Sequence, residues 1–460
     1  MLIDNLDDTI AAISTAVGEG SVGIVRLSGP RALIITDALF VGKKGLKPSK
    51  SKTYTMHYGK IVHAGQILDE VILTVMRAPH SYTREDVVEI NCHGGIVALR
   101  KILDSVLENG CRMATPGEFT RRAFLNGRID LAQAEAVIDI IRAKTDSALK
   151  VGIEQLRGGL SKEIYKIRQG LLNILVILEA NIDFPEEDLK PQDMAGISKS
   201  LAVVRAQLNR LLDSAKAGRI LRDGIHVVIC GKPNVGKSSL LNALLKKERS
   251  IVTSVAGTTR DSIEEIIDIK GIPVRIVDTA GILKPRNLIE KKAVWRAKTH
   301  IRSSDLAIIL FDASRRLDED DWKLMKAVKN KNVIAVINKI DLKGQIQKEK
   351  LFKVFHKVVE LSAKKAKNIN LLEDALCEFV YQGKLRSPEF MLVSNLRHIS
   401  ALKEAQKLFS NASSALDNKL PLEFLTQDLK DASVYLDEIL GKDLSGDLLD
   451  RIFADFCIGK

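Results

Sequence analysis

Residues 226–245 read HVVICGKPNVGKSSLLNALL, which is an apolar run, a glycine-rich loop and a stretch with helical apolar spacing. The loop, residues 231–238, matches the pattern of a phosphate-binding loop between a buried strand and a helix. Its glycines let backbone N–H groups close around phosphates, Lys237 can reach the terminal phosphates, and the Ser238 hydroxyl can ligate Mg²⁺. This stretch therefore predicts a domain that binds a nucleoside triphosphate.

Three further short motifs follow the loop in the order that a guanine-nucleotide domain requires. Each stands at the carboxyl end of an apolar run that predicts a strand, namely VRIVD, NVIAVIN and KVVEL. In a doubly wound sheet the carboxyl ends of parallel strands form one binding edge, so the loop and the motifs should converge on one ligand. The motifs are DTAG at 278–281, NKID at 338–341 and SAK at 362–364.

Two aspartates in these motifs have distinct predicted tasks. Asp278 can lie behind the Mg²⁺ shell, with the Gly281 amide at the terminal phosphate. Asp341 can accept two hydrogen bonds from guanine, whereas adenine would leave its carboxylate unpaired. The sequence thus predicts a doubly wound α/β GTPase domain. Its predicted GTP contacts are Asn234, Val235, Gly236, Lys237, Ser238, Ser239, Thr253, Ser254, Val255, Ala256, Gly257, Thr258, Thr259, Asp278, Thr279, Ala280, Gly281, Asn338, Lys339, Asp341, Ser362, Ala363 and Lys364.

The domain lacks two catalytic features of Ras-like GTPases. Ile282 follows the DTAG motif, where a water-orienting glutamine would be expected, and there is no obvious arginine finger. Asn234 and loop carbonyls of residues 253–261 could form a cage of hard oxygens for a monovalent cation, which would neutralise charge in the transition state. Asn234 could instead only stabilise the turn of the loop. Thr259 is the natural second Mg²⁺ ligand.

The composition predicts a cytoplasmic protein with a polyanionic partner. The 460 residues have room for about three domains. A net charge of +12 favours a partner such as tRNA, although a generally basic proteome would explain it equally well. No run of about 18 apolar residues occurs and the first residues, MLIDNLDD, are acidic, so neither a membrane span nor a secretory signal is expected. The five scattered cysteines indicate neither a disulfide framework nor a zinc site.

Apolar periodicity divides the chain into four segments. Residues 1–126 mix short strand-like runs such as VGIVRL with turns, an α+β pattern. Residues 127–221 and 384–460 have helical spacing, and residues 222–383 form the predicted nucleotide domain. The two helical stretches are expected to form one bundle, with the GTPase domain inserted between them.

Further motifs stand outside the nucleotide domain, at both ends of the chain and between them. They are GIVRLSG at 23–29, SYTRED at 81–86, HGG at 93–95, PGEFT at 116–120, AFLNG at 123–127, DLAQAEA at 130–136 and CIGK at 457–460. Together with the GTPase motifs, this set resembles the MnmE or TrmE family of tRNA-modifying GTPases. The resemblance spans nearly the whole chain, and the terminal Cys-x-Gly-Lys behind a GTPase domain is highly specific.

The resemblance implies a folate site in the amino-terminal domain, where a tetrahydrofolate, as the 5-formyl or methylene derivative, supplies a one-carbon unit. Arg26, Glu85, Arg128 and Lys460 match the family's folate-contacting positions. Arg128 stands where many relatives carry lysine, so the charge is kept although the two cations differ in shape. Arg84 replaces a glycine usual in its motif, which bears on the conformation of that loop.

The resemblance also implies roles within the GTPase domain and at the tail. Glu290 matches a water-positioning residue, although a solvated glutamate near a helix start is the alternative. Relatives need Cys457 for modification, as a thiolate or only for its position. The predicted catalytic residues are Glu290, Lys237 and Cys457. The predicted K⁺ ligands are Asn234, Thr253, Val255 and Thr258, and the predicted Mg²⁺ ligands are Ser238 and Thr259.

The function implied is K⁺-activated GTP hydrolysis coupled to modification of carbon 5 of the wobble uridine in tRNA, adding an aminomethyl or carboxymethylaminomethyl group. The implied partner is a flavoprotein of the MnmG (GidA) type, whose FAD and NADH manage the redox chemistry. Family members dimerise through the amino-terminal domain, so a homodimer, and with the partner a heterotetramer or larger assembly, is expected.

Two other classes are alternatives. An Era-like or Der-like GTPase switch in ribosome assembly has nearly the same nucleotide motifs, but it predicts a KH-type or tandem GTPase region, and neither pattern is visible. A folate-dependent enzyme that uses GTP only for regulation also fits, because motifs do not encode a hydrolysis rate.

Overall fold

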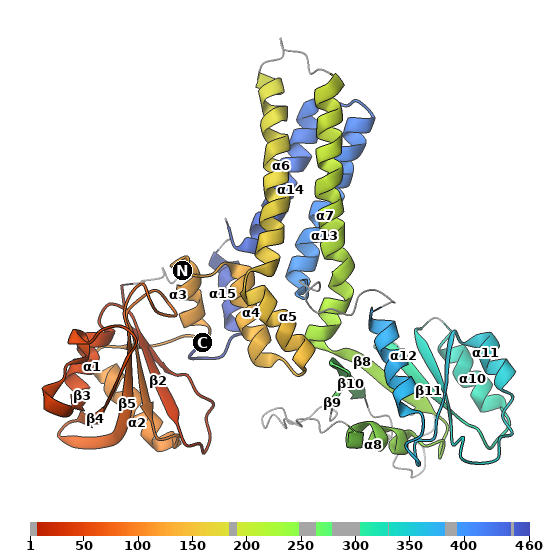
Figure 1. Cartoon of the computed structure of the whole chain (residues 1–460), viewed down its shortest axis with the longest axis horizontal. Helices are drawn as coiled ribbons and strands as arrows, with labels where there is room; N and C mark the ends of the chain where they lie inside the picture. Colours follow the sequence, from red (N-terminus) through yellow and green to blue (C-terminus); the bar gives the residue numbers. More distant parts are fainter. Residues whose placement is uncertain are drawn as a thin grey trace. The chain divides into compact units, whose positions relative to one another are not determined.

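The computed structural model describes residues 7–183, 191–247, 264–277, 304–329, 331–381, 393–442 and 446–460. The chain divides into two compact units (Figure 1). Unit 1 joins both ends of the chain, Met1–Ile138 and Leu436–Lys460, and unit 2 is Asp139–Tyr435.

Unit 1 is built on a seven-stranded sheet with helices on one face. Its elements are β1 Ile10–Ile13, β2 Gly23–Ser28, α1 Ala32–Leu39, β3 Phe40–Gly42, 3₁₀ turns at Lys43–Gly45 and Pro48–Lys50, β4 Thr55–His63, β5 Gln66–Met76, β6 Val87–Cys92, α2 Ile96–Glu108 and β7 Arg112–Met113. The strand order is β3-β4-β5-β6-β2-β1-β7, antiparallel except for the β1–β7 pair. Alternate residues of the strands share a buried core with α1 and α2, which is the pattern of a sheet covered on one face.

The carboxyl-terminal segment packs against helices of the amino-terminal region within unit 1. Helices α3 Glu118–Leu125, the first turns of α4 Leu131–Arg142 and α15 Gly446–Ala454 meet there. Phe453 and Phe456, with ring centroids 5.3 Å apart, share an apolar cluster with α3 and α4. At the start of α4, Asp130 and Gln133 exchange side-chain to backbone hydrogen bonds, which satisfies orphan amides of its first turn.

The helical part of unit 2 consists of long helices that lie side by side (Figure 1). A hydrogen bond from Gln406 Nε2 to Asn209 Oδ1 at 2.7 Å and an ion pair between Lys430 and Glu179 at 2.8 Å join helices distant in sequence. Thr145 and Asn395 cap helix amino termini with their side chains. The helices are α5 Asp146–Leu156, α6 Gly159–Asp183, α7 Pro191–Asp223, α13 Leu396–Asp417 and α14 Leu422–Leu440, whose end belongs to unit 1.

A second sheet lies between α7 and α13 in the chain. Its elements are β8 Ile225–Gly231, α8 Lys237–Lys247, β9 Glu264–Ile269, β10 Ile272–Val277, β11 Leu306–Asp312, α10 Glu319–Ala327, β12 Val333–Asn338, α11 Lys348–Val354, β13 Lys357–Glu360 and α12 Ile369–Tyr381. The order is β13-β12-β11-β8-β10-β9, parallel except for the β9–β10 hairpin. One core lies under α8 and α12 and another under α10 and α11, so helices cover both faces.

The predicted fold class is confirmed. An α+β amino-terminal part, a helical part and a doubly wound sheet are present, and the strands of that sheet are near-continuous apolar runs because both of its faces are covered. Within the described ranges, no helix combines the length and apolar character that crossing a membrane requires.

Candidate functional site

The glycine-rich loop connects β8 to α8 and depends on two glycines. Gly231 has φ +154°, and a Cβ there would lie 2.8 Å from the Leu310 carbonyl oxygen. Gly236 has φ +102°, and a Cβ there would lie 2.3 Å from Asn338 Nδ2. Side chains are therefore excluded where the loop passes the neighbouring strand ends.

Asn338 joins three of the predicted motifs. Its Nδ2 donates to the Val235 carbonyl oxygen in the loop at 2.8 Å, and its Oδ1 accepts from the Ala363 amide at 2.9 Å. The same oxygen accepts from the Lys339 amide at 2.8 Å. Asn338 is 2% exposed, so each of these bonds replaces water that the amide cannot reach. The structure thus brings the 231–238, 338–341 and 362–364 motifs together.

Lys339 is held between the loop and β11. Its Nζ donates to the Asn234 carbonyl oxygen and to Asp312 Oδ2, both at 2.7 Å. Burial opposes ionisation of Asp312, but hydrogen bonds from Lys339 and Ser314 outweigh it and hold the pKa of this carboxyl below its usual value. Asp312 was not among the predicted residues. Its position at the end of β11, next to the strand that carries Lys339, is the signal that could have revealed it.

A hydrogen bond also orders the end of the site that is predicted to contact the base. Ser362 Oγ donates to Asp341 Oδ1 at 2.5 Å, and this hydrogen bond is the main cause that lowers the pKa of Asp341. Asp341 is exposed, so its carboxylate is accessible for a base. At the other end, Lys237 Nζ lies over the loop and donates to the carbonyl oxygens of Gly231 and Lys232 at 3.0 and 2.9 Å.

The remaining predictions for the nucleotide domain divide into two sets. Ser238 and Ser239 are exposed in the first turn of α8, and Lys364 is exposed beside the buried Ala363. The other predicted residues lie outside the described part of the chain; they are Thr253, Ser254, Val255, Ala256, Gly257, Thr258, Thr259, Asp278, Thr279, Ala280, Gly281 and Glu290.

A second cluster forms in unit 1 around Tyr82. Arg26 lies 5.8 Å from the centroid of the Tyr82 ring and 5.6 Å from that of Phe119, and Arg128 lies 4.8 Å from the Tyr82 centroid. Glu89 pairs with Arg26 at 2.7 Å. Two cations beside aromatic rings can hold a flat, anionic ligand by stacking and charge. The structure thus brings the predicted residues Arg26 and Arg128 together.

The chain's tail reaches the same cluster. Arg26 Nη1 donates to the Gly459 carbonyl oxygen at 3.3 Å, and the Gly117 amide donates to the Cys457 carbonyl oxygen at 3.3 Å. Gly459 has φ +88°, and a Cβ there would lie 2.3 Å from the Ile13 carbonyl oxygen. Lys460 follows directly, and the Cys457 thiol is exposed. Backbone contacts therefore bring the last four residues to Arg26.

Glu85 belongs to a charge network beside this cluster. It accepts from Ser28 Oγ at 2.6 Å and from Arg122 Nη1 at 3.1 Å. Arg122 is 2% exposed and also pairs with Asp8 and Glu118. Burial works against its charge, but these carboxylates outweigh burial and raise its pKa. Glu85 is thus fixed by partners that the sequence did not reveal.

Arg84 stands where the family resemblance implies a glycine, and its backbone is left-handed, with φ +59°. Its Nη1 donates to the Asn126 carbonyl oxygen at 2.9 Å. Since a non-glycine residue is strained in this region, the bond to Asn126 helps to hold the turn that precedes Glu85.

Comparisons with known proteins show the family to which the chain is similar. Residues 9–128 match the model of the GTP-binding protein TrmE N-terminus, and residues 131–457 match that of the MnmE helical domain. The tRNA modification GTPase MnmE of Desulforamulus reducens is 45% identical over 466 residues, which cover 99% of this chain and 100% of that protein. The enzyme of the same name from Bacillus subtilis is 43% identical, covering 98% and 100%. A structure of Aquifex aeolicus Era bound to GDP.AlF4- covers 40% of this chain and 66% of its own, with 32% identity and a TM-score of 0.28.

A phosphate loop, an NKxD motif and a backing loop at one edge of a doubly wound sheet define the class of protein, a P-loop GTPase. The matches to both family models and to full-length relatives specify it further. The chain belongs to the MnmE family of tRNA modification GTPases and is a GTP-hydrolysing enzyme.

Proposed function

We propose that this chain is a K⁺-activated GTPase that, with a flavoprotein of the MnmG (GidA) type, modifies carbon 5 of the wobble uridine of tRNA. One observation carries the proposal beyond GTP hydrolysis, namely that the terminal Cys-Ile-Gly-Lys docks beside Arg26, Tyr82 and Arg128. We propose that the protein acts in the cytoplasm.

In the nucleotide domain, we propose that Lys237 moves from its loop carbonyls to the terminal phosphates when GTP binds. Asp341, ionised and oriented by Ser362, would accept the two guanine donors. Ser238 and Thr259 would ligate Mg²⁺, and Glu290 would orient the attacking water. Asn234, Thr253, Val255 and Thr258 would hold K⁺. The exposed loop position of Asn234 fits such a hard-oxygen cage.

In unit 1, we propose that the cluster around Tyr82 binds tetrahydrofolate. Arg26 and Arg128 would hold the ligand by charge and stacking, with Glu85 and Lys460 at its polar edge. Bound tetrahydrofolate, as the 5-formyl or methylene derivative, would supply the one-carbon unit, and the partner's FAD and NADH would manage redox. The exposed thiol of Cys457 is available either as a thiolate or as a positioning group.

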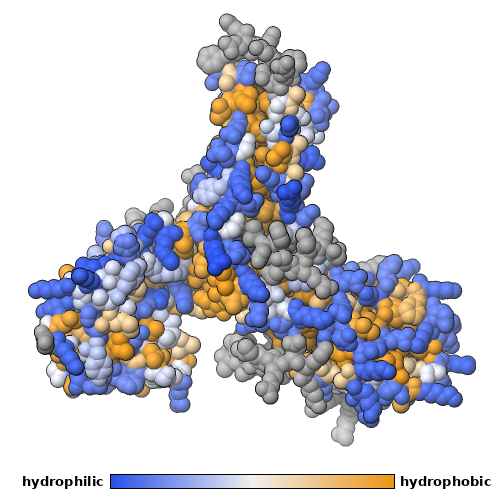
Figure 2. Space-filling view, viewed as in Figure 1, coloured by the Kyte–Doolittle hydropathy of each residue, from blue (hydrophilic) through white to orange (hydrophobic). Residues whose placement is uncertain are grey.

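We also propose a homodimer through unit 1, which with the flavoprotein makes a heterotetramer or larger assembly. Met56 and Tyr58 of β4 and Ile72 of β5 are 66%, 58% and 41% exposed, and Tyr58 and Ile72 are direct cross-strand partners. Figure 2 shows apolar side chains among the polar ones on the surface of this unit. Exposed apolar residues on one sheet are a feature of protein interfaces.

The proposed domain limits follow from the same organisation. We propose a folate-binding and dimerisation domain over 1–126, helical parts over 127–221 and 384–460, and a GTPase domain over 222–383. Each limit can be checked by limited proteolysis of the whole chain, because exposed connections between domains are cleaved first.

GTP turnover in KCl and in NaCl at equal ionic strength tests the nucleotide half of the proposal. We expect strong stimulation by K⁺ that is lost in Asn234→Ala, whereas equal slow rates in both salts would contradict the cation cage. Mass spectrometry of tRNA from a strain lacking the gene tests the modification half. Intact wobble uridine modification with altered ribosomal subunits would favour the Era-like alternative.

A further inference from the structure

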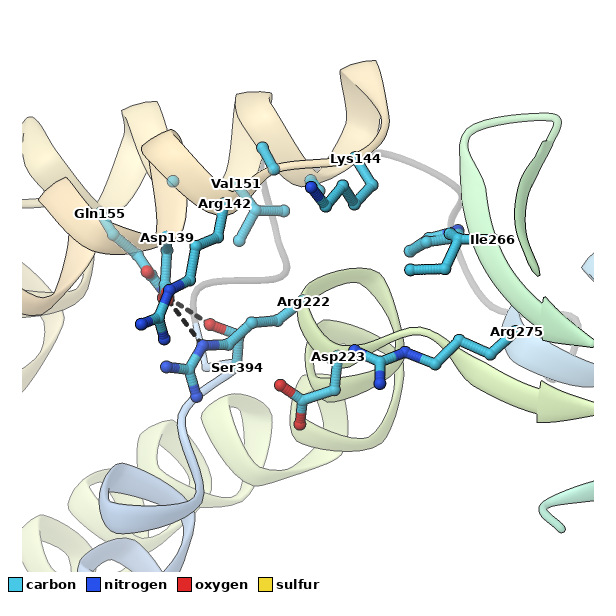
Figure 3. Close-up of a pocket in the computed structure, with 14 residues that line it drawn as sticks. Asp139, Arg142, Lys144, Val151, Gln155, Arg222, Asp223, Ile266, Arg275 and Ser394 are labelled. Atoms are coloured by element: carbon cyan, nitrogen blue, oxygen red, sulfur yellow. Dashed lines mark hydrogen bonds and ion pairs between the residues drawn. The ribbon is translucent and has the colours of Figure 1, made fainter. Parts of the chain in front are cut away.

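Unit 2 contains a pocket of about 250 Å³ whose lining includes none of the predicted nucleotide or folate residues. It lies between the end of α4, α5, the end of α7 and the β9–β10 hairpin, with Ser394 before α13 closing one side (Figure 3). Val151, Ile266 and Pro273 form its apolar part. The helical part and the sheet of unit 2 therefore both line this pocket.

The polar lining of this pocket is predominantly basic. Four cationic side chains face two carboxylates, which leaves a formal excess of two positive charges. The cations come from three separate stretches of chain, so their convergence is a product of the fold and not of a basic run in the sequence. They are Arg142, Lys144, Arg222 and Arg275, against Asp139 and Asp223.

Two hydrogen bonds fix one wall of the pocket (Figure 3). Arg222 Nε donates to Asp139 Oδ1 at 2.7 Å, and the two side chains are only 26% and 10% exposed. Gln155 Nε2 donates to Ser394 Oγ at 3.0 Å, and both residues are buried. The Asp139 carboxylate and the Gln155 amide therefore hold Arg222 and Ser394 in place on this wall of the pocket.

This pocket is separate from the predicted GTP site. Arg275 of β10 pairs in register with His226, at the start of β8, whereas the phosphate loop begins at Gly231. Five residues of strand at roughly 3.3 Å each place about 16 Å between them. A ligand in the pocket would therefore bind the opposite end of β8 from the nucleotide.

We propose that this pocket binds a phosphate group. Arg142, Arg222 and Arg275 project from α4, α7 and β10, so guanidinium groups can approach a tetrahedral anion from several sides. Its volume lies below the roughly 300–1,000 Å³ of pockets for whole drug-sized ligands, which suits a phosphate or pyrophosphate group. That group belongs either to a free phosphorylated compound or to the backbone of RNA.

Such a ligand would connect the helical part of unit 2 to its sheet. Arg142 and Arg222 are on helices and Arg275 is on β10, the strand that runs directly into Asp278 of the predicted GTP site. A ligand that binds only the folded chain also raises the unfolding temperature of the protein. The stabilisation grows with the logarithm of the ligand concentration once that concentration exceeds Kd. The inference does not depend on the wobble-uridine or folate chemistry proposed above.

Calorimetric titration of the full chain with inorganic phosphate and with pyrophosphate tests the proposal. The protein is first saturated with GDP and Mg²⁺, so that the phosphate loop is occupied. We expect Arg275→Gln and Arg142→Gln each to raise the Kd about tenfold or more, because each removes a charge-assisted bond. Arg210→Gln, at an exposed position on α7 outside the pocket, is the matched control and should bind like the unmodified chain.

Titration with tRNA distinguishes the two sources of phosphate. Binding of pyrophosphate that both pocket variants lose supports a free ligand. If only tRNA binding weakens in both variants, and more than in Arg210→Gln, with a smaller salt dependence, the phosphate is that of RNA. If neither ligand distinguishes the pocket variants from the control, the proposal is wrong. Circular dichroism checks folding, and Arg142, at an exposed helix end, serves if Arg275→Gln does not fold.

Discussion

The nucleotide site and the Tyr82 cluster are assembled in opposite ways. Every described part of the nucleotide site directly follows a strand of one sheet, and Asn338 ties the parts together through backbone carbonyl and amide groups. The Tyr82 cluster instead joins residues near position 26 to the last residues of the chain. The first arrangement is local to each motif, whereas the second exists only after the two ends of the chain have met.

The two arrangements predict different sensitivities. In the nucleotide site, a change where the phosphate loop passes Asn338 should disrupt several motifs at once, because they share this residue. In the Tyr82 cluster, a change in the tail should release the tail and leave the GTPase domain intact. The predictions below test this difference, beginning with the largest expected effect.

Gly236→Val should abolish tight GTP binding. A Cβ at this position would lie 2.3 Å from Asn338 Nδ2 in a backbone with φ +102°, so the loop or Asn338 must move. We expect GTP affinity to fall on the order of a hundredfold or more, since the loop amides that cradle the phosphates would be displaced. Fluorescent GTP titration measures this, with Gly196→Ala, which meets nothing within 4 Å, as the control. If Gly236→Val keeps its affinity for GTP, then GTP binding does not need the close approach of the loop to Asn338.

Gly459→Val should separate the two sites functionally. Its Cβ would meet the Ile13 carbonyl oxygen at 2.3 Å, so the tail must leave its place beside Arg26. We expect folate affinity to fall about tenfold or more, as when a charge-assisted bond and its neighbours are lost, with the GTP turnover rate unchanged. Equilibrium dialysis with 5-formyltetrahydrofolate measures the first and phosphate release the second. Unchanged folate binding would show that the tail is not part of the folate site. The control is Gly446→Ala, because a Cβ at this position meets no atom within 4 Å.

The nucleotide site and the Tyr82 cluster also differ in how much of each could be predicted from the sequence. The phosphate loop and the NKID and SAK motifs were predictable because each pairs a short pattern with the strand before it. The partners Tyr82 and Phe119 were not, because nothing adjacent in sequence distinguishes them from ordinary loop or helix residues. Asp312 had one signal, its position at the end of the strand β11, and that position alone does not assign it to the site. The assignment of Lys460 to the same site as Arg26 came from family resemblance alone. The basic pocket at Arg275 had no sequence signal, since four distant stretches form it. The functional roles of the predicted residues stay predictions.

Asp312→Asn should weaken GTP binding by a moderate amount. Asp312 is 8% exposed and accepts a hydrogen bond from Lys339 Nζ at 2.7 Å, so it acts by positioning Lys339. Hydrogen bonds to charged groups contribute about 1.5–3 kcal/mol, but Asn234 still holds Lys339, so we expect the KM for GTP to rise about tenfold, with kcat little changed. Steady-state kinetics check this against Asp320→Asn, an exposed control. A fall in kcat at constant KM would contradict a positioning role.

Ser362→Ala should have the smallest effect on GTP binding. It tests how the site is ordered before the nucleotide binds. The Ser362 hydroxyl is the main cause of the lowered pKa of Asp341, so its removal should raise that pKa toward the ordinary value of 3.8. Because the pKa is lowered in the folded chain, the stabilisation is present above pH 3.8 and is lost as the pH falls through the folded value. At neutral pH the carboxylate is ionised in both proteins, so GTP affinity should change little. An NMR titration of the Asp341 carboxyl carbon measures the shift. An unchanged pKa would show that Ser362 does not orient the carboxylate before guanine binds, and the base-recognition end would then depend on the ligand for its order, as the Tyr82 cluster depends on the tail.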